Sequence, residues 1–374
     1  MKISTSEDAP LFAERPEWAD VQPLEQYENA NPIAPIFYTE EYKDATNYFR
    51  AIVRANEKTH RVLDLTENII RQNPAHYSAW QYRYETLLCL LPAETEMQDG
   101  LPRLLGQELA LMDELAVLFL KTYQVWHHRR LLVQLTKQPT RELSFIKKGL
   151  QVDAKNYHTW SYRQWLLASC YGPGAVTETD EDEDELLVDQ SNAVWAAELD
   201  FIDTMLVSDV RNNSAWHHRF FVVFECGDGS DRAHVLRREL VYAKQSISLA
   251  PNNPSAWNYL RGVLSHTGTP FASQRDFARL YAFSRSGPVR RDIVDLDNPP
   301  PSDDAELPCV HAMEFLADIL EIEGVAKAKT GPQEAAQAIE QAVEIWKKLA
   351  YEQDSIRKRY WVHRIRDAHQ SLVV

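Results

Sequence analysis

The sequence predicts an all-α protein built from stacked helical hairpins, and three observations lead to this prediction. Five segments of the chain align without gaps around a tryptophan. Only 12 of the 374 residues are glycine, which is few for a fold that depends on tight turns. From Thr39 onward, apolar residues recur at helical spacing, beginning with Tyr48, Phe49, Ile52 and Val53. We therefore expect more than half of the chain to be helical, with no sheet.

The five repeat segments share a tryptophan that is followed three residues later by arginine in the first four copies. They are residues 75–83, 121–129, 155–163, 211–219 and 252–260. The fifth has Leu260 instead of arginine, and a degenerate sixth copy surrounds Trp361. Residues three apart share one face of a helix, so each Trp–Arg pair is expected to serve packing and hydrogen bonding between units. A hairpin of this kind cannot bury its apolar face alone, and stacking buries it.

The flanking and connecting segments follow in order. Residues 1–38 are rich in proline and glutamate and predict an extended or partly disordered N-terminal arm. Residues 39–374 form the helical repeat domain. Within it, an acidic insertion at 172–188 contains Asp180–Glu185, a run that predicts a solvated loop. A Pro-rich linker at 286–304 includes Asn298–Pro301, which cannot continue a helix.

Composition limits the classes of function. The formal net charge of −15 disfavours nucleic acid as a partner, because phosphate backbones attract clustered lysine and arginine. No apolar run approaches the ~18 residues of a transmembrane segment, and the N-terminus lacks the pattern of a signal peptide, so we expect a cytoplasmic protein. The four cysteines form no CxxC pair, so the sequence gives no zinc knuckle or disulfide framework.

Two histidine pairs, His127-His128 and His217-His218, look like metal ligands. Adjacent residues of a helix point about 100° apart, however, so the two rings of a pair diverge. We therefore expect no zinc site in this chain.

One register of the repeats carries positive charge on this acidic chain. The position five residues before the tryptophan is Lys121, Lys155 and Arg211 in three consecutive copies. Stacking aligns equivalent positions near helix N-termini, where the side chains and the helix dipoles both favour an anion. The alternative is three solvated loop cations, and the spacing alone leaves both interpretations open.

These repeats resemble those of protein prenyltransferase α subunits. The resemblance covers about nine-tenths of the chain and is most specific at Lys121–Arg130, which reads Lys-Thr-Tyr-Gln-Val-Trp-His-His-Arg-Arg. Further segments similar to the farnesyltransferase/geranylgeranyltransferase-I α chain are 15–20, 47–51, 209–214 and 354–358.

The resemblance implies a right-handed crescent of helical hairpins wrapped around a separate β subunit. That β subunit would hold Zn²⁺, and Mg²⁺ would assist the reaction. The reaction moves a farnesyl or geranylgeranyl group from its diphosphate to the cysteine of a C-terminal CaaX sequence, as found on Ras- and Rho-type small GTPases. The nucleophile would be the substrate's own cysteine.

The resemblance also assigns residues, position by position. Lys121 matches the lysine that reaches the diphosphate, and Tyr123 matches a neighbour lining the active site. Gln124 matches the residue that hydrogen-bonds the C-terminal carboxylate of the CaaX peptide. The next repeat contributes residues that match positions facing the same cavity, namely Asn156, Tyr157 and His158.

Two rival functions stay open at this point. The α subunit of the Rab geranylgeranyltransferase shares the repeats, but it has no need for Gln124 to hold a CaaX carboxylate. A non-catalytic scaffold similar to TPR proteins is the second rival, and the complete Lys121–Arg130 motif disfavours it. The sequence does not distinguish a farnesyl from a geranylgeranyl β partner.

Overall fold

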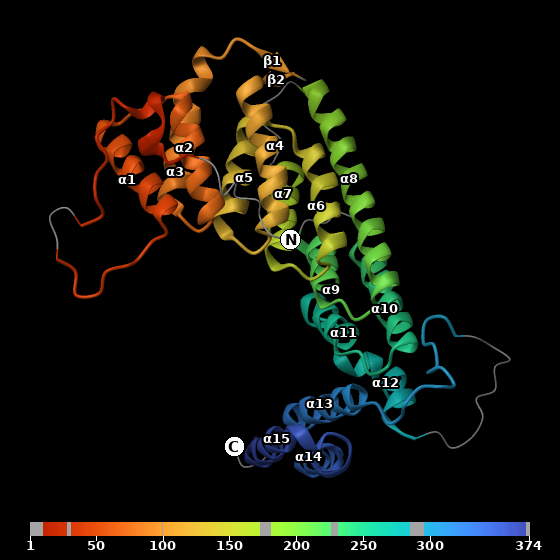
Figure 1. Ribbon diagram of the computed structural model, residues 1–374. Helices are drawn as coiled ribbons and strands as arrows, with labels where there is room; N and C mark the ends of the chain where they lie inside the picture. Colours follow the sequence, from red (N-terminus) through yellow and green to blue (C-terminus); the bar gives the residue numbers. More distant parts are fainter. Residues whose placement is uncertain are drawn as a thin grey trace. The chain divides into compact units, whose positions relative to one another are not determined.

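A computed structural model describes residues 10–27, 31–98, 100–172, 181–225, 231–284 and 295–371, with the backbone alone for 181–191 and 371 (Figure 1). This part of the chain is dominated by α-helices, which confirms the all-α prediction. The chain divides into two compact units, residues 1–170 and 171–374. Within the ranges described, no helix combines the length and the apolar character needed to cross a bilayer.

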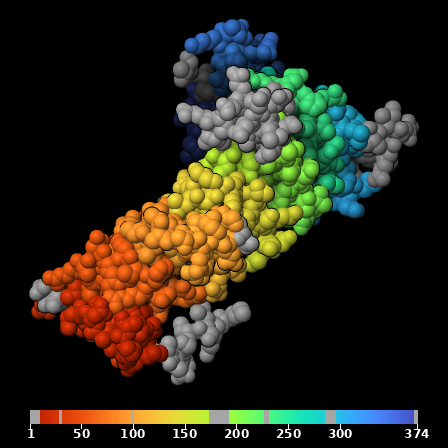
Figure 2. Space-filling model, turned by 90° about the horizontal axis from the view of Figure 1, so that it is seen from above, coloured from red at the N-terminus to blue at the C-terminus, as the bar shows by residue number. Residues whose placement is uncertain are grey.

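The first unit is a series of antiparallel helical hairpins. Its helices are α1 (Glu40–Ala55), α2 (His60–Gln72), α3 (Tyr77–Leu90), α4 (Arg103–Leu118), α5 (Tyr123–Thr136), α6 (Pro139–Val152) and α7 (Tyr157–Tyr171). Short turns of 3-10 helix occur at Phe12–Glu14, Pro16–Trp18 and Leu91–Ala93. Figure 2 shows the segments of this unit as successive bands from red to yellow, so each hairpin adjoins the next one in sequence.

The prediction that the chain has no sheet is wrong in one small place. Strands β1 (Met97–Gln98) and β2 (Leu101–Pro102) form a two-stranded antiparallel ladder between α3 and α4. Gly100 adopts a φ of 78° in the turn, a conformation open to glycine without steric cost. The ladder is a tight connection and adds no sheet layer to the fold.

The second helix of every repeat begins at the same register. Helices α3, α5, α7, α9 (Asn213–Phe220) and α11 (Pro254–Thr267) each start three residues before the repeat tryptophan. In α9 and α11 the preceding asparagine caps the helix, with Oδ1 of Asn212 and of Asn253 accepting backbone N–H bonds. These starts place the position five residues before the tryptophan just ahead of a helix N-terminus, as the sequence predicts.

Each repeat tryptophan donates a hydrogen bond to the loop in front of its own helix. The indole Nε1 of Trp80, Trp126, Trp160, Trp216 and Trp257 donates to the backbone carbonyl six residues earlier, at 2.8 to 2.9 Å. A buried indole N–H needs an acceptor, and this recurring bond supplies one while it closes the loop. The tryptophan of the motif therefore holds the loop before the helix in one conformation.

Three of the repeat arginines form buried ion pairs with the first helix of the next hairpin. Arg83 is bidentate to Glu108 at 2.8 and 2.6 Å, and Arg129 is bidentate to Glu142 at 2.7 and 2.9 Å. In the second unit, Arg219 binds Glu239 in the same way. These contacts confirm that the arginines join neighbouring helices by hydrogen bonds.

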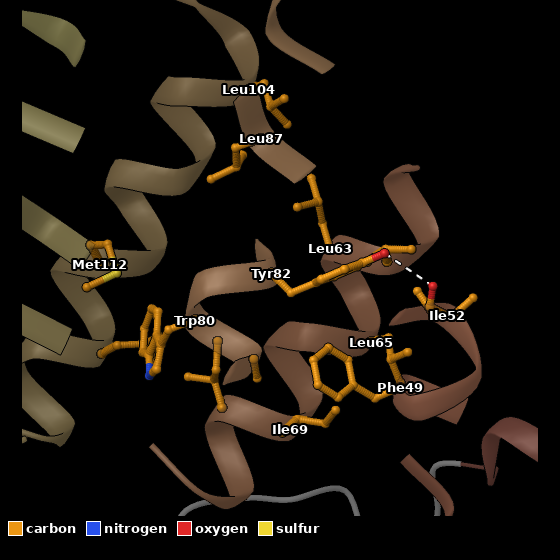
Figure 3. Packing of buried hydrophobic residues seen from close by; sticks show 14 of the residues in the cluster. Phe49, Ile52, Leu63, Leu65, Ile69, Trp80, Tyr82, Leu87, Leu104 and Met112 are labelled. Atoms are coloured by element: carbon orange, nitrogen blue, oxygen red, sulfur yellow. Dashed lines mark hydrogen bonds between the residues drawn. The ribbon is translucent and has the colours of Figure 1, made fainter. Parts of the chain in front are cut away.

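The core of the first unit lies between the hairpins (Figure 3). Leu65, Ile69 and Met112 are completely buried there. Tyr82 reaches across this cluster, and its hydroxyl donates to the carbonyl of Ile52 at 3.2 Å. Stacking of successive hairpins thus buries a continuous apolar face, as expected of a repeat array.

The N-terminal arm departs from the prediction of an extended or partly disordered segment. Phe12 and Trp18 are 3% and 2% exposed and belong to the core cluster. The Trp18 ring packs edge-on against Tyr48 of α1, with centroids 5.6 Å apart. Two aromatic side chains bury enough apolar surface to order this part of the arm, although its composition is polar.

The second unit continues the repeats and ends in a three-helix cluster. Its remaining helices are α8 (Glu181–Ser208), α10 (Arg232–Leu249), α12 (Arg275–Ala282), α13 (Val310–Lys327), α14 (Pro332–Lys348) and α15 (Lys358–Ser371). Single turns occur at Phe221–Glu225, Phe271–Gln274, Leu349–Gln353 and Ser355–Arg357. Helices α13, α14 and α15 lie together near the C-terminus (Figure 1).

Two connections in this unit were predicted to be irregular. The prediction that Asp180–Glu185 forms a solvated loop is wrong from Glu181 onward, because the backbone of α8 is helical from that residue. The helix dipole favours acidic residues in the first turn of a helix. Residues 173–180 of the acidic insertion lie outside the described part. The Pro-rich linker is irregular over its described residues, 295–304, and Tyr281 donates to the carbonyl of Pro299 there at 2.7 Å.

Candidate functional site

The loop before α5 places Lys121 directly ahead of a helix N-terminus. The carbonyl of Leu120 accepts from Trp126 Nε1 at 2.9 Å, and the backbone N–H of Thr122 donates to the carbonyl of Phe119 at 3.0 Å. The side chain of Lys121 is exposed, and no carboxylate in the described part of the chain forms an ion pair with it. Its ammonium group is thus presented to the outside, next to free N–H groups of the first turn.

The other two cations of the register occupy the same local position. Lys155 precedes α7, and its backbone N–H donates to Asp153 Oδ1 at 3.2 Å. Arg211 precedes α9, and its backbone N–H donates to Asp209 Oδ1 at 2.9 Å. Both side chains are exposed. Lys121 and Lys155 belong to the first unit, whereas Arg211 belongs to the second and is described there by itself.

Three predicted residues from two successive repeats form one aromatic cluster. The rings of Tyr123 and His158 meet edge to face with centroids 4.3 Å apart, and Tyr157 lies 5.5 Å from the same imidazole. The tyrosines are 65% and 67% exposed, so the cluster presents its faces outward. Burial lowers the pKa of His158 below its ordinary value, and the ring is therefore neutral at pH 7.

Gln124 lies in the first turn of α5 and bridges to the preceding repeat. Its Nε2 donates to the carbonyl of Ala75 at 3.3 Å. A primary amide nitrogen carries two hydrogens, so this bond leaves one N–H of Gln124 for a further acceptor. The side chain is held in place by the protein and still has a donor to offer.

Asn156 differs from the expectation that it faces the cavity. Its side chain is only 3% exposed. Oδ1 accepts from the backbone N and from Oγ1 of Thr159 at 3.0 and 3.1 Å, which caps α7. An asparagine before a helix suits a cap as well as it suits ligand binding, and the capping geometry turns its amide inward.

The histidine pairs have the diverging geometry that helix periodicity predicts. His127 and His217 are exposed. His128 is buried with Nε2 2.7 Å from Glu108, and His218 is buried with Nε2 2.6 Å from a glutamate of α8. Across the ranges that the structure describes, no group of three or more His, Cys, Asp or Glu is placed to hold a metal ion.

The sequence did not reveal the buried glutamates that pair with the repeat arginines. Glu142 accepts from Tyr162, and Glu239 accepts from Tyr259, at 2.8 and 2.6 Å. Each glutamate precedes its tyrosine by 20 residues, and this repeated interval is a signal that could have revealed them. For Glu108, burial raises the pKa, but the adjacent Arg83 and the hydrogen bonds outweigh burial and lower it to about 2.

Five repeats of the chain match the model of a known family. The repeat described as "Protein prenyltransferase alpha subunit repeat" matches residues 59–90, 105–136, 139–170, 195–226 and 236–267. In the first unit, each match covers one hairpin to within two residues of its ends, namely α2 with α3, α4 with α5, and α6 with α7.

Curated relatives and a solved structure extend the similarity. The chain is 34% identical to the protein farnesyltransferase/geranylgeranyltransferase type-1 subunit alpha of Dictyostelium discoideum, over 67% of this chain and 70% of that protein. It is 40% identical to the subunit of the same name from Schizosaccharomyces pombe, over 67% and 74%. The fold resembles a chain of Candida albicans protein geranylgeranyltransferase-I complexed with GGPP, with a TM-score of 0.69, 26% identity, and 93% and 97% of the two chains covered.

A rival named above matches over a smaller share of its length. The chain is 29% identical to the geranylgeranyl transferase type-2 subunit alpha of Mus musculus, and the match spans 60% of this chain but 37% of that protein. The type-1 subunits are thus matched over most of their length and the type-2 subunit over a minority. Repeat by repeat and in overall sequence, this chain belongs to the family of protein prenyltransferase α subunits.

Proposed function

We propose that this chain acts as the α subunit of a type-1 protein prenyltransferase. Together with a separate β subunit, it would transfer a farnesyl or geranylgeranyl group from its diphosphate to the cysteine of a CaaX sequence. The observation that carries the proposal is the Lys121–Arg130 segment, which places an exposed cation, an exposed tyrosine and a glutamine at one helix N-terminus. The cytoplasmic location expected from the sequence stays a prediction.

The role proposed for Lys121 is electrostatic. Breaking the allylic carbon–oxygen bond moves negative charge onto the departing diphosphate. A cation fixed beside the N-terminus of α5 stabilises that charge more than it stabilises the intact substrate, which lowers the barrier. Lys155, in the next repeat, would add to this electrostatic stabilisation of the diphosphate. We assign Arg211 a smaller contribution to it.

The aromatic cluster would form a wall beside this cation. Tyr123 and Tyr157 offer hydroxyl groups and broad apolar faces, both suited to an isoprenoid diphosphate with its polar head and hydrocarbon tail. Because His158 is neutral, it would act as a hydrogen-bonding partner and add no charge.

Zinc does not fit the described residues of this chain, and we assign it to the partner subunit. There it would activate the substrate cysteine as a thiolate. Mg²⁺ would assist at the diphosphate. No ligand for either ion is proposed on this chain.

Gln124 provides the test on the peptide side. Replacing Gln124 by alanine should raise KM for a CaaX peptide and leave kcat nearly unchanged, because a carboxylate bond is present in ground and transition states alike. Losing a hydrogen bond to a charged group corresponds to about 1.5–3 kcal/mol, or roughly a 10- to 100-fold increase. Steady-state kinetics with a peptide series would measure this increase in KM.

A matched control is a peptide with a C-terminal amide, for which the variant and the parent enzyme should differ little. An equal loss with both peptides would contradict the assignment.

Assembly with a β subunit tests the function as a whole. We expect the chain to form a one-to-one complex with a type-1 β subunit when the two are co-expressed, and to prenylate CaaX peptides only in that complex. Expressed alone, it should aggregate or unfold readily and carry no stoichiometric zinc. A zinc-loaded, active monomer would overturn the proposal. A complex that modifies Rab proteins but no CaaX peptide would favour the type-2 rival, and a complex without transferase activity would favour a scaffold.

A further inference from the structure

The amide of Asn156 joins two successive repeats. While its Oδ1 caps α7 through Thr159, its Nδ2 donates to the backbone carbonyl of Leu120 in the preceding repeat, at 3.4 Å. That distance is at the long end for a hydrogen bond, in a side chain that is 3% exposed. Both ends of the amide are therefore engaged within the protein, and its burial leaves it almost no surface to offer a substrate.

The acceptor of this bond lies next to the proposed catalytic cation. Leu120 immediately precedes Lys121, and its carbonyl also accepts from Trp126 Nε1 at 2.9 Å. The carbonyl is thus held from two sides, by its own repeat and by the next one. Because a peptide unit is planar, fixing the carbonyl of Leu120 also fixes the nitrogen and Cα of Lys121.

The same arrangement recurs in the second unit. Asn253 Nδ2 donates to the carbonyl of Val210 at 2.7 Å, and Trp216 Nε1 donates to that oxygen at 2.8 Å. Val210 immediately precedes Arg211, the cation at the matching register. We call these two hydrogen bonds to one carbonyl, from the tryptophan and from the asparagine of the next repeat, the clamp. Because the clamp occurs in both units, it is a feature of the repeat and not of one loop.

We infer that Asn156 is a positioning residue for Lys121, acting through the carbonyl of Leu120. This inference rests on the proposed role of Lys121 in the reaction. The clamp would hold the lysine backbone where its side chain meets the developing charge. Small displacements of a catalytic group cost rate, so loosening the clamp should slow transfer without touching the substrate directly.

The test uses a substitution that removes only one of the two functions of the amide. Serine at position 156 still accepts from the backbone N–H of Thr159 as an N-cap, but it is too short to reach Leu120. In the α–β heterodimer, Asn156→Ser should lower the single-turnover rate about three- to tenfold, the effect of one neutral hydrogen bond. Isoprenoid diphosphate affinity and the thermal unfolding midpoint should stay close to those of the parent enzyme.

Asn253→Ser is the matched control, because it removes the same bond from the loop that carries Arg211. It should change the single-turnover rate less than twofold. If both variants slow transfer equally, the effect is a general loosening of the fold and the inference is overturned.

A double-mutant cycle separates positioning of Lys121 from every other role of Asn156. In a Lys121→Ala background, Asn156→Ser should cause no further loss of rate, since the residue it positions is gone. A further loss of the full three- to tenfold would overturn the inference. If Lys121→Ala itself leaves the rate unchanged, the proposed role of Lys121 fails and this inference falls with it. If Lys121→Ala slows transfer and Asn156→Ser does not, the inference alone fails.

Discussion

Replacing Lys121 by alanine should lower kcat of the assembled heterodimer about 10²–10³-fold, the effect of removing one donor to a developing anion. Isoprenoid diphosphate binding should weaken far less, because the charge that Lys121 meets appears only as the carbon–oxygen bond breaks. The exposed side chain makes no ion pair with a described carboxylate, so its removal leaves no buried partner behind. Zinc content and heterodimer assembly should therefore survive.

Single-turnover kinetics of the heterodimer measure this effect directly, with isoprenoid affinity determined separately. Lys155→Ala and Arg211→Ala are the matched controls, since each removes a cation at the same register of another repeat. Both should cost less than Lys121→Ala. A Lys121→Ala enzyme with the parent rate would mean that the cation register is structural. Activation of the diphosphate would then belong to the partner subunit and Mg²⁺.

The second large effect concerns stability. Arg129→Ala should lower the free energy of unfolding by about 3–5 kcal/mol, because it leaves Glu142 as a buried charge without its partner. Arg129 is completely buried, and its guanidinium lies 3.6 Å from the centre of the Phe145 ring. Its pKa lies above the ordinary value: burial lowers it, but the bonds to Glu142 and the attraction of that carboxylate outweigh burial.

Urea denaturation of the heterodimer at fixed concentration would measure the loss. Arg237→Ala is the control, because Arg237 pairs with Asp297 at 3.3 Å on the surface, where such a pair contributes at most about 1 kcal/mol. Equal effects of the two variants would show that the buried pair has no special weight.

A rescue experiment tests the physical reason for this loss. The triple variant Arg129→Met, Glu142→Met, Tyr162→Phe should recover most of the stability, since it leaves neither a buried charge nor the Tyr162 hydroxyl without a partner. The fifth repeat supports this expectation, because Leu260 fills the arginine position there and is completely buried. No recovery in the triple variant would mean that the site needs the shape of the charged pair.

Local features of the fold could be predicted from the sequence alone. The tryptophan and arginine on one helix face and the cation register near helix N-termini follow from a motif of nine residues. All of these depend on interactions between residues a few positions apart. Such interactions act in the same way in every copy, so aligned repeats reveal them.

Contacts between distant residues could not be read in this way. The arginines meet their glutamates across 25, 13 and 20 residues in the three pairs. No fixed spacing from the arginine identifies its partner, because connections of different length separate the helices; the 20-residue interval to a later tyrosine marks Glu142 and Glu239 instead. The burial of Phe12 and Trp18 likewise depends on a cluster built by later helices.

Asn156 shows the difference most clearly. Its position before α7 was evident from the repeat, but the same position suits a substrate ligand and a helix cap. Only the packing of one hairpin on the next brings its amide to Leu120. The sequence by itself determined the repeat, the helix starts and the cation register, since these rest on local spacing. The tertiary structure alone decided which polar groups are buried and whom they bind, because burial depends on surfaces that meet only when the hairpins stack.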